Sequence, residues 1–371
     1  MVRIDKSIAE KILTIGPEYH EHRGGIGALL SIYAQYFDEF KFIPTYKYHD
    51  KNFTKSLYYL RQLTRLIATL ARDKKIKIVH IHGAQRGSFY RKYFIFLIAN
   101  KLFRKKIIYH IHSGCFDTFY HKSNFIQARL IRNFVNKTDL VICLSQYWED
   151  FFKKNFTIRR LSILNNVILE PEYGQGPVQA PGATPINFLF LGRIEKKKGI
   201  YDIIEVIIRN RDYFRDKIKL NIGGEGEVDN LKEIIRTNQL SDIVEYLGWV
   251  EGEQKKLVFS KTNVYILPSY TEGLPISILE AMSFKMPVIS TPVGGIPEIV
   301  ENDINGILVE PGNFEQIFLA LDFFVRNQDK IQEYGNSSFE KAKCFFPGNV
   351  FDKLKENYKS LLESSQSSTL L

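Results

Sequence analysis

The sequence predicts an α/β protein built from two domains, each a parallel sheet with helices on both faces. Its strands are near-continuous apolar runs that alternate with helical segments, a pattern typical of parallel strands buried on both faces. The alternation stops once, over 170–185, where Pro, Gly and Ala recur without periodicity, as in an interdomain linker. A chain of 371 residues also has room for two domains of ordinary size.

The domain boundaries follow from this break. Residues 1–168 are expected to form the N-terminal domain, 169–185 the linker and 186–345 the C-terminal domain. The segment 346–364 reads as a last helix, and whether it crosses back to the N-terminal domain stays open. The polar tail 365–371 is expected to be disordered.

Charge is distributed unevenly between the two halves. Residues 1–170 contain 29 Lys and Arg against 13 Asp and Glu, a balance of +16, and the remainder contains 22 against 28, a balance of −6. The basic half favours a polyanionic partner such as an anionic membrane surface, a nucleic acid or a phosphorylated acceptor. Ordinary solvated surface charge is the alternative. No nucleic-acid recognition motif is present, so we expect no nucleic-acid partner.

The composition is that of a soluble globular protein in a reducing compartment. The 44% apolar and 25% charged content is ordinary for such proteins. Three cysteines at wide spacing indicate neither a disulfide framework nor a metal site. The charged start of the chain does not read as a signal peptide, and no apolar run is long enough to span a bilayer. We expect a cytoplasmic location.

In the first half, strands and helices follow one another in regular order. The predicted strands are Lys11–Ile15, Ile76–His82, Lys106–His112 and Asp139–Ser145, and the predicted helices are Ala28–Phe37, Asn52–Arg72, Phe89–Phe103, Asn124–Asn136 and Gln146–Lys154. In the helix 52–72 the expected buried face consists of Phe53, Leu57, Leu60, Thr64, Ile67 and Leu70 or Ala71. The basic and aromatic helix 89–103 could lie on a membrane interface, but we expect most of its rings to cover the sheet.

A glycine-rich turn, Gly24-Gly25-Ile26-Gly27, lies between the first strand and the first helix. Such a turn lets the backbone approach a phosphate or a sugar closely. A plain connecting turn is the alternative, because GGIG is not a dinucleotide fingerprint.

The second half repeats the alternation. The predicted strands are Ile186–Leu191, Ile218–Ile222, Val244–Leu247, Val264–Leu267 and Gly306–Val309, and the predicted helices are Gly199–Asn210, Val228–Asn238, Glu253–Ser260, Ile276–Phe284, Phe314–Asn327 and Asn349–Glu363.

The stretch 268–300, PSYTEGLPISILEAMSFKMPVISTPVGGIPEIV, carries the strongest functional signal. Pro275 is expected at the first helical position, so that the helix start faces the preceding loop as an anion site. Glu272 lies before this helix and Glu280 about one and a half turns inside it. Carboxylates on both sides of a phosphate site suit a nucleotide sugar. The alternative is a buried strand–helix unit with two solvated glutamates.

Two further features lie where predicted strands end. Arg193 and Lys198 flank a strand–helix junction and are suited to a diphosphate, although a solvated basic turn is the alternative. His112 is either a ligand contact or a satisfied core histidine. No Asp-x-Asp pair, zinc-type spacing or Walker loop is present, so no metal and no other cofactor is expected.

These motifs resemble glycosyltransferase family 4, the group 1 enzymes of bacterial surface-polysaccharide and glycolipid synthesis. The resemblance is carried in the second half by GR…KG, GGEGE, LGWV, PSYTEGLPISILEAM, VGGIPEIV and NGILVEPGN, and in the first half by GGIG, His112, DLVICLS and Asn165-Asn166-Val167. It implies the GT-B fold, two Rossmann-like domains facing across a cleft.

The resemblance also implies residue roles. Arg193 and Lys198 would bind the donor diphosphate, with Gly25 approaching from the other domain. Glu280 would hold the ribose, and Glu272 the hexose, together with the amides of Gly273 and Leu274. His112 would touch the donor sugar, and Glu225 and Val250 would frame the base. Ser113-Gly114 follows His112 where many members have an acidic residue.

The implied activity is transfer of a hexose from a UDP- or GDP-sugar to a hydroxyl of a saccharide or lipid-linked acceptor, with retained configuration and without metal. The enzyme would bind an anionic membrane surface as a peripheral protein on the inner face of the cell membrane. A nucleotide-sugar epimerase or hydrolase of the same fold, or a non-catalytic sugar-nucleotide-binding partner, remain alternatives.

Overall fold

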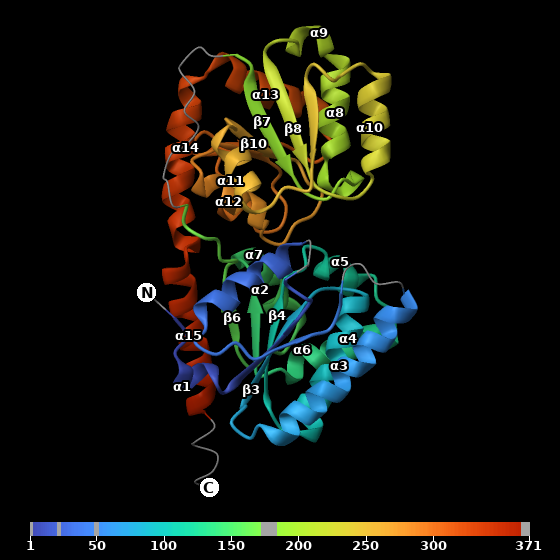
Figure 1. Cartoon of the computed structure of the whole chain (residues 1–371), viewed down its shortest axis with the longest axis vertical. Helices are drawn as coiled ribbons and strands as arrows, with labels where there is room; N and C mark the ends of the chain where they lie inside the picture. The colour runs from blue at the N-terminus through green and yellow to red at the C-terminus, as the bar shows by residue number, and fades with distance from the viewer. Residues whose placement is uncertain (1–2, 21–23, 48–51, 172–183, 365–371) are drawn as a thin grey trace. The chain divides into compact units, whose positions relative to one another are not determined.

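The computed structural model describes residues 3–20, 24–47, 52–171 and 184–364. The chain divides into two compact units, one of residues 1–168 with 345–371 and the other of residues 169–344. Each unit contains one six-stranded sheet with helices around it (Figure 1). Every strand pairing in both sheets is parallel, so the predicted α/β class is confirmed.

The sheet of unit 1 has the strand order β2-β1-β3-β4-β5-β6. Its strands are β1 (Ile12–Gly16), β2 (Phe42–Pro44), β3 (Ile78–Gly83), β4 (Lys106–Ile111), β5 (Leu140–Cys143) and β6 (Leu161–Ile163). Every residue of β1, β3 and β5 is buried, which explains why these runs are near-continuously apolar; the exceptions are Thr14 in β1 and His80 and His82 in β3. The short β2 was not predicted, because three residues give too little periodicity to read.

The helices of unit 1 cover both faces of this sheet. They are α1 (Lys6–Ala9), α2 (Gly25–Tyr36), α3 (Asn52–Arg72), α4 (Gly87–Phe96), α5 (Phe116–His121), α6 (Phe125–Lys137), α7 (Gln146–Asn155) and α15 (Pro347–Glu363). The predicted helix 89–103 is in fact α4 followed by a π-helix, η1 (Leu97–Leu102). Asn124 and Gln127 form a capping box that starts α6.

The predicted buried face of α3 is correct at Leu70 but wrong at its exposed members, which are Leu57, Leu60, Thr64 and Ile67. The side chain of Phe53 lies outside the described residues. Leu57 and Leu60 are 61% and 57% exposed, whereas Leu66 and Leu70 are buried in the core. The helix carries two apolar stripes, and tertiary contacts select between them. The Tyr59 hydroxyl donates to the carbonyl of Arg91 at 2.6 Å, which directs the stripe of Tyr59, Leu66 and Leu70 inward.

The last helix, α15, belongs to unit 1. The ring of Phe351 stacks on Tyr36 at 4.8 Å, and Lys355 pairs with Asp5 at 2.7 Å. Helices α2 and α15 therefore share the same face of the sheet. Within the described residues, no helix combines the length and the apolar content needed to cross a bilayer.

The sheet of unit 2 has the strand order β12-β11-β10-β7-β8-β9. Its strands are β7 (Ile186–Leu191), β8 (Ile218–Gly223), β9 (Val244–Gly248), β10 (Val264–Leu267), β11 (Val288–Ser290) and β12 (Gly306–Leu308). Its helical segments are η2 (Lys196–Lys198), α8 (Ile200–Arg209), α9 (Arg211–Phe214), α10 (Val228–Thr237), α11 (Gly252–Ser260), α12 (Ile276–Ser283), η3 (Ile296–Glu298), α13 (Phe314–Arg326) and α14 (Asp329–Ala342), with η4 (Lys343–Phe345) at the boundary.

Candidate functional site

The loops at the carboxyl edge of the second sheet are hydrogen-bonded to one another. The amide of Ile194, in the loop after β7, donates to the carbonyl oxygen of Glu225, in the loop after β8, at 2.7 Å. The amide of Tyr270, in the loop after β10, donates to the carbonyl oxygen of Lys197 at 2.9 Å. Gly199 has a φ of 72°, and a Cβ there would lie 2.1 Å from the Pro268 carbonyl oxygen. Only glycine permits this approach. The strand-end loops thus form one connected platform, the place where α/β sheets bind ligands.

Lys198 and Glu272 contact each other on this platform. The Lys198 ammonium lies 2.6 Å from Oε1 of Glu272, and the Ser269 hydroxyl donates to the same oxygen at 2.8 Å. Glu272 is only 8% exposed, and a buried carboxylate is costly unless it is paired and hydrogen-bonded. The structure therefore brings together the predicted diphosphate-binding lysine and the predicted hexose-binding glutamate.

The loop that contains Glu272 packs against residues 293–300, the VGGIPEIV segment. The amide of Gly295 donates to the carbonyl of Gly273 at 2.8 Å. Gly294 has a φ of 57°, and a Cβ there would lie 1.9 Å from the Glu272 carbonyl oxygen. This explains why a glycine pair lies about twenty residues beyond Glu272 in the sequence. Leu274 is buried, so its side chain anchors the loop.

The predicted place of Pro275 is wrong by one position. Pro275 is the N-cap residue, with a ψ of 119°, and α12 begins at Ile276. This shift does not change the expected anion site, because the first amides of α12 still point toward the loop that precedes the helix.

Glu280, in the second turn of α12, has a partner that the sequence did not indicate. The ammonium of Lys255, on α11, lies 2.6 and 2.5 Å from its two carboxylate oxygens. The two side chains are 26% and 24% exposed, so the pair is accessible to a ligand. No spacing rule links residues 255 and 280, because their contact depends on how α11 and α12 pack.

The remaining predicted residues of unit 2 lie on the same edge but are less engaged. The Arg193 side chain is 58% exposed and pairs with Glu195 at 3.4 Å. Val250 is buried, and a Cβ on Gly223 would lie 2.9 Å from its Cγ2 atom. Glu225 contributes its carbonyl to the platform. Each of these residues thus follows the end of a strand: Arg193 follows β7, Glu225 follows β8 and Val250 follows β9.

Two predicted site residues lie in unit 1, one at the start of a helix and the other directly after a strand. Gly25 is the first residue of α2, which follows β1. His112 follows β4, and its amide donates to the Gly83 carbonyl at 3.0 Å. His112 keeps part of its surface accessible.

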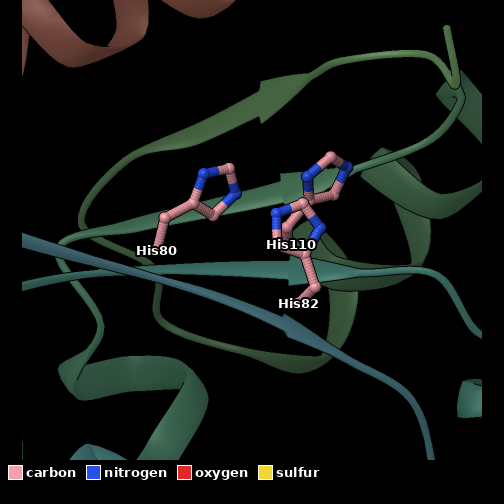
Figure 2. Close-up of side chains that lie close together, drawn as sticks. All are labelled: His80, His82 and His110. Carbon is pink, nitrogen blue, oxygen red and sulfur yellow. The ribbon is translucent and has the colours of Figure 1, made fainter. Parts of the chain in front are cut away.

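His112 is the outer member of a set of histidines that we call the histidine column: His80, His82, His110 and His112. His80 and His82 alternate along β3, and His110 lies beside His82 on β4. Their three rings gather on one face of the sheet (Figure 2). Nδ1 of His82 lies 2.9 Å from Nε2 of His112, and Nδ1 of His80 lies 2.7 Å from the Tyr358 hydroxyl.

Burial keeps the column neutral. It lowers the pKa of His80 to about 3 and that of His112 to about 3, where a hydrogen bond with the Asn166 side chain acts in the opposite direction. The pKa values of His82 and His110 also lie well below the usual range, chiefly because of burial. We singled out only His112 from the sequence. The alternating pattern HIH in two strands could have indicated the column, because alternate residues share a face.

Solved structures show which class of fold this is. The chain superposes on sucrose-phosphate synthase from Thermosynechococcus elongatus with a TM-score of 0.76 and 16% identity, covering 98% of this chain and 100% of that one. HepE from Anabaena, solved with UDP and glucose, matches with a TM-score of 0.72 and 17% identity over 94% and 99% of the two chains. The predicted GT-B class is confirmed.

Sequence comparison then gives the family. Residues 30–168 match the model of Glycosyltransferase Family 4, and residues 178–341 match that of Glycosyl transferases group 1. The chain belongs to these glycosyltransferases and is a transferase enzyme. A relative from Escherichia coli K12, named putative colanic acid biosynthesis glycosyltransferase WcaL, is 33% identical over 58% of this chain and 55% of its own length.

Proposed function

We propose that the protein transfers a hexose from a UDP- or GDP-sugar to a hydroxyl of a saccharide or lipid-linked acceptor in polysaccharide synthesis, with retained configuration and without metal. The observation that carries the proposal is the ion pair between Lys198 and Glu272, whose side-chain atoms lie 2.6 Å apart. Glu272 belongs to the loop that leads into α12. A cation for phosphate and a carboxylate for sugar hydroxyls meet at one point. The names of HepE, solved with UDP and glucose, and of WcaL support the donor and the pathway class.

Leaving-group stabilisation is the main task of this site. Cleavage of the glycosyl–phosphate bond leaves positive charge on the sugar and negative charge on the diphosphate. Lys198, Arg193 and the amides at the start of α12 supply positive charge where the diphosphate would lie. Lys198 can share its ammonium hydrogens between Glu272 and a phosphate oxygen, so donor binding need not break the ion pair.

The two glutamates hold the two sugars of the donor. Glu272 accepts hydrogen bonds from hexose hydroxyls, and Glu280 accepts them from the ribose. Because Lys255 pairs with Glu280, the ribose approaches a carboxylate that is already oriented. The acceptor hydroxyl attacks from the face that the diphosphate leaves, and the diphosphate takes its proton. No protein nucleophile takes part.

The exposed surface of unit 1 supports an anionic membrane as the partner. Phe125 and Ile126, at the start of α6, are 79% and 69% exposed, and a groove of about 240 Å³ beside them is lined by Phe125, Ala128, Arg129 and Arg132. Exposed apolar residues flanked by arginines suit the interface of anionic lipids. We propose that the enzyme works as a peripheral protein on the inner face of the cell membrane.

Donor binding and turnover test the proposed reaction. A thermal-shift screen of nucleoside diphosphates and their sugars identifies the donor, because a ligand that binds only the folded chain raises Tm. With that donor, Glu272→Gln is expected to lower kcat by a factor of about 100 or more, and EDTA is expected to leave the rate unchanged. Rapid donor consumption without acceptor would instead favour an epimerase or hydrolase. Loss of activity in EDTA that magnesium restores would overturn metal independence.

Vesicle sedimentation tests the membrane partner. The wild-type chain is expected to bind vesicles with anionic lipids at low salt and to release at high salt. Phe125→Ser with Ile126→Ser should weaken binding, whereas Leu319→Ser, at an exposed position of α13 in unit 2, is the matched control. Equal binding to neutral and anionic vesicles would contradict the proposal.

A further inference from the structure

The histidine column contains three buried rings for which the proposed reaction gives no role. His80, His82 and His110 are at most 1% exposed, and they lie beneath the partly accessible His112. Four adjacent imidazoles in an apolar sheet are costly to bury unless their nitrogens are used. The column therefore calls for a physical explanation.

A metal ion is one explanation, because one ring nitrogen from each of His80, His82 and His110 lies within 4.8 Å of the others. A metal needs lone pairs that converge on one point. Two of the three ring pairs are instead stacked, with interplanar angles of 11° between His80 and His110 and 26° between His80 and His82, and the third, His82 with His110, is tilted by 36°. Nδ1 of His80 and Nδ1 of His82 are already used in contacts with Tyr358 and His112. The geometry thus favours a hydrogen-bonded stack.

One contact joins this stack to His112, the residue that the family resemblance places at the donor sugar. Nδ1 of His82 lies 2.9 Å from Nε2 of His112, and the two ring planes differ by 13°. Both rings are neutral near neutral pH, because burial holds their pKa values low. A neutral imidazole has one N–H. The position of the proton in this contact therefore sets the tautomers of both residues.

The surroundings of His82 decide which nitrogen donates. Nε2 of His82 is buried and has no hydrogen-bond partner in the described part of the chain. A buried N–H without an acceptor is rarer in folded proteins than an unused acceptor. His82 accordingly carries its proton on Nδ1 and donates it to Nε2 of His112. His112 then carries its own proton on Nδ1, because its Nε2 accepts from His82.

We propose that His82 is a positioning residue for His112, holding that ring in one orientation and in the Nδ1–H tautomer. The inference rests on the proposed function, in which we also assign His112 the contact with the donor sugar that the family resemblance implies, and it deepens that function. The hydrogen bond from His82 restrains the His112 ring. A restrained ring presents the same orientation to a donor sugar each time, which lowers the entropic part of the activation free energy. His82 itself does not contact the substrate.

The tautomer of His112 can be measured directly by NMR, without an activity assay. Long-range ¹H–¹⁵N spectra of the full chain labelled with [¹⁵N]histidine report which ring nitrogen carries the proton, and His112→Gln identifies the His112 signals. We expect Nδ1–H at His112 in the wild-type chain and in His82→Asn, whose amide can still donate. His82→Phe should populate Nε2–H. Nε2–H in the wild-type chain, or an unchanged tautomer in His82→Phe, would overturn the inference.

Kinetics separate positioning from a structural role. His82→Phe is expected to lower kcat about tenfold with a much smaller change in the donor KM, since about one hydrogen bond is lost, and His82→Asn should restore most of the rate. His80→Phe is the matched control, because His80 is equally buried but bonds Tyr358. An equal loss of kcat in His80→Phe would refute positioning. Absence of any transfer by the wild-type chain would refute the proposed function, and the spectra would still decide the tautomer.

Discussion

Mild acid is expected to unfold unit 1 before unit 2. All eight histidines of the chain lie within residues 1–121, and four of them form the histidine column. Lowering the pH from about 7.5 to about 5 protonates the four histidines of the column in the unfolded chain, while their rings in the folded chain stay neutral. The unfolded state then binds more protons than the folded state, so the stability of unit 1 falls as the pH drops below the ordinary histidine pKa.

The size of the effect follows from the pKa shifts. His80 and His112 have folded pKa values of about 3, against 6.5 in the unfolded chain. At about pH 5 each therefore costs about 2 kcal/mol, from roughly 1.5 pH units at 1.36 kcal/mol per unit. The two together cost about 4 kcal/mol, and His82 and His110 act in the same direction. Such a loss is a large part of the 5–15 kcal/mol typical of a domain. The other titratable groups around the column are Lys92, Tyr33 and Tyr358.

The two tryptophans make the assay specific to each unit. Trp148 lies in unit 1 and Trp249 in unit 2. Urea denaturation of Trp249→Phe therefore reports unit 1, and that of Trp148→Phe reports unit 2. Unit 1 should lose at least about 4 kcal/mol between the two pH values, and unit 2, which has no histidine, should change much less. His80→Gln should reduce the pH dependence, because it removes one of the buried rings whose folded pKa is low. Equal pH dependence of both units, or a flat profile for unit 1, would refute the reasoning.

Three further predictions concern single residues. Gly294→Ala should lower the free energy of unfolding by more than about 2 kcal/mol and displace Glu272, because the new Cβ would lie 1.9 Å from the Glu272 carbonyl oxygen. Gly252→Ala is the matched control: it has the same φ of 57° but nothing within 4 Å, and it should cost about 1 kcal/mol. Equal Tm losses in the two variants would contradict the close-approach explanation. Lys92→Met should raise Tm, because Lys92 is 2% exposed and burial lowers its pKa well below the usual range; a lower Tm would show that its bond to Thr45 outweighs burial. Glu280→Gln should raise the donor KM with a smaller effect on kcat, since it holds the ribose rather than the reacting sugar. A loss confined to kcat would place Glu280 at the reacting centre.

Local patterns in the sequence determined most of the secondary structure. Apolar residues located β7, β8 and β10 within one residue of their bounds, because parallel strands covered by helices are mainly apolar. The predicted ranges of α6 and α7 agree with the observed helices within one residue at each end. The motif around Glu272 and Glu280, the basic turn at Arg193 and Lys198 and the family resemblance were equally visible, since each lies within a short stretch of chain.

Only the tertiary structure decided which of these residues meet. The sequence placed Leu57 and Leu60 on the buried face of α3, whereas packing exposed them and buried Leu66 beside the correctly predicted Leu70. Lys198 pairs with Glu272 over 74 positions, and His82 meets His112 over 30. Periodicity reports the conformation of a segment and its apolar sides, because those depend on neighbours a few residues away. The pairing of distant charges and rings depends on how strands and helices stack, and no local pattern contains that information.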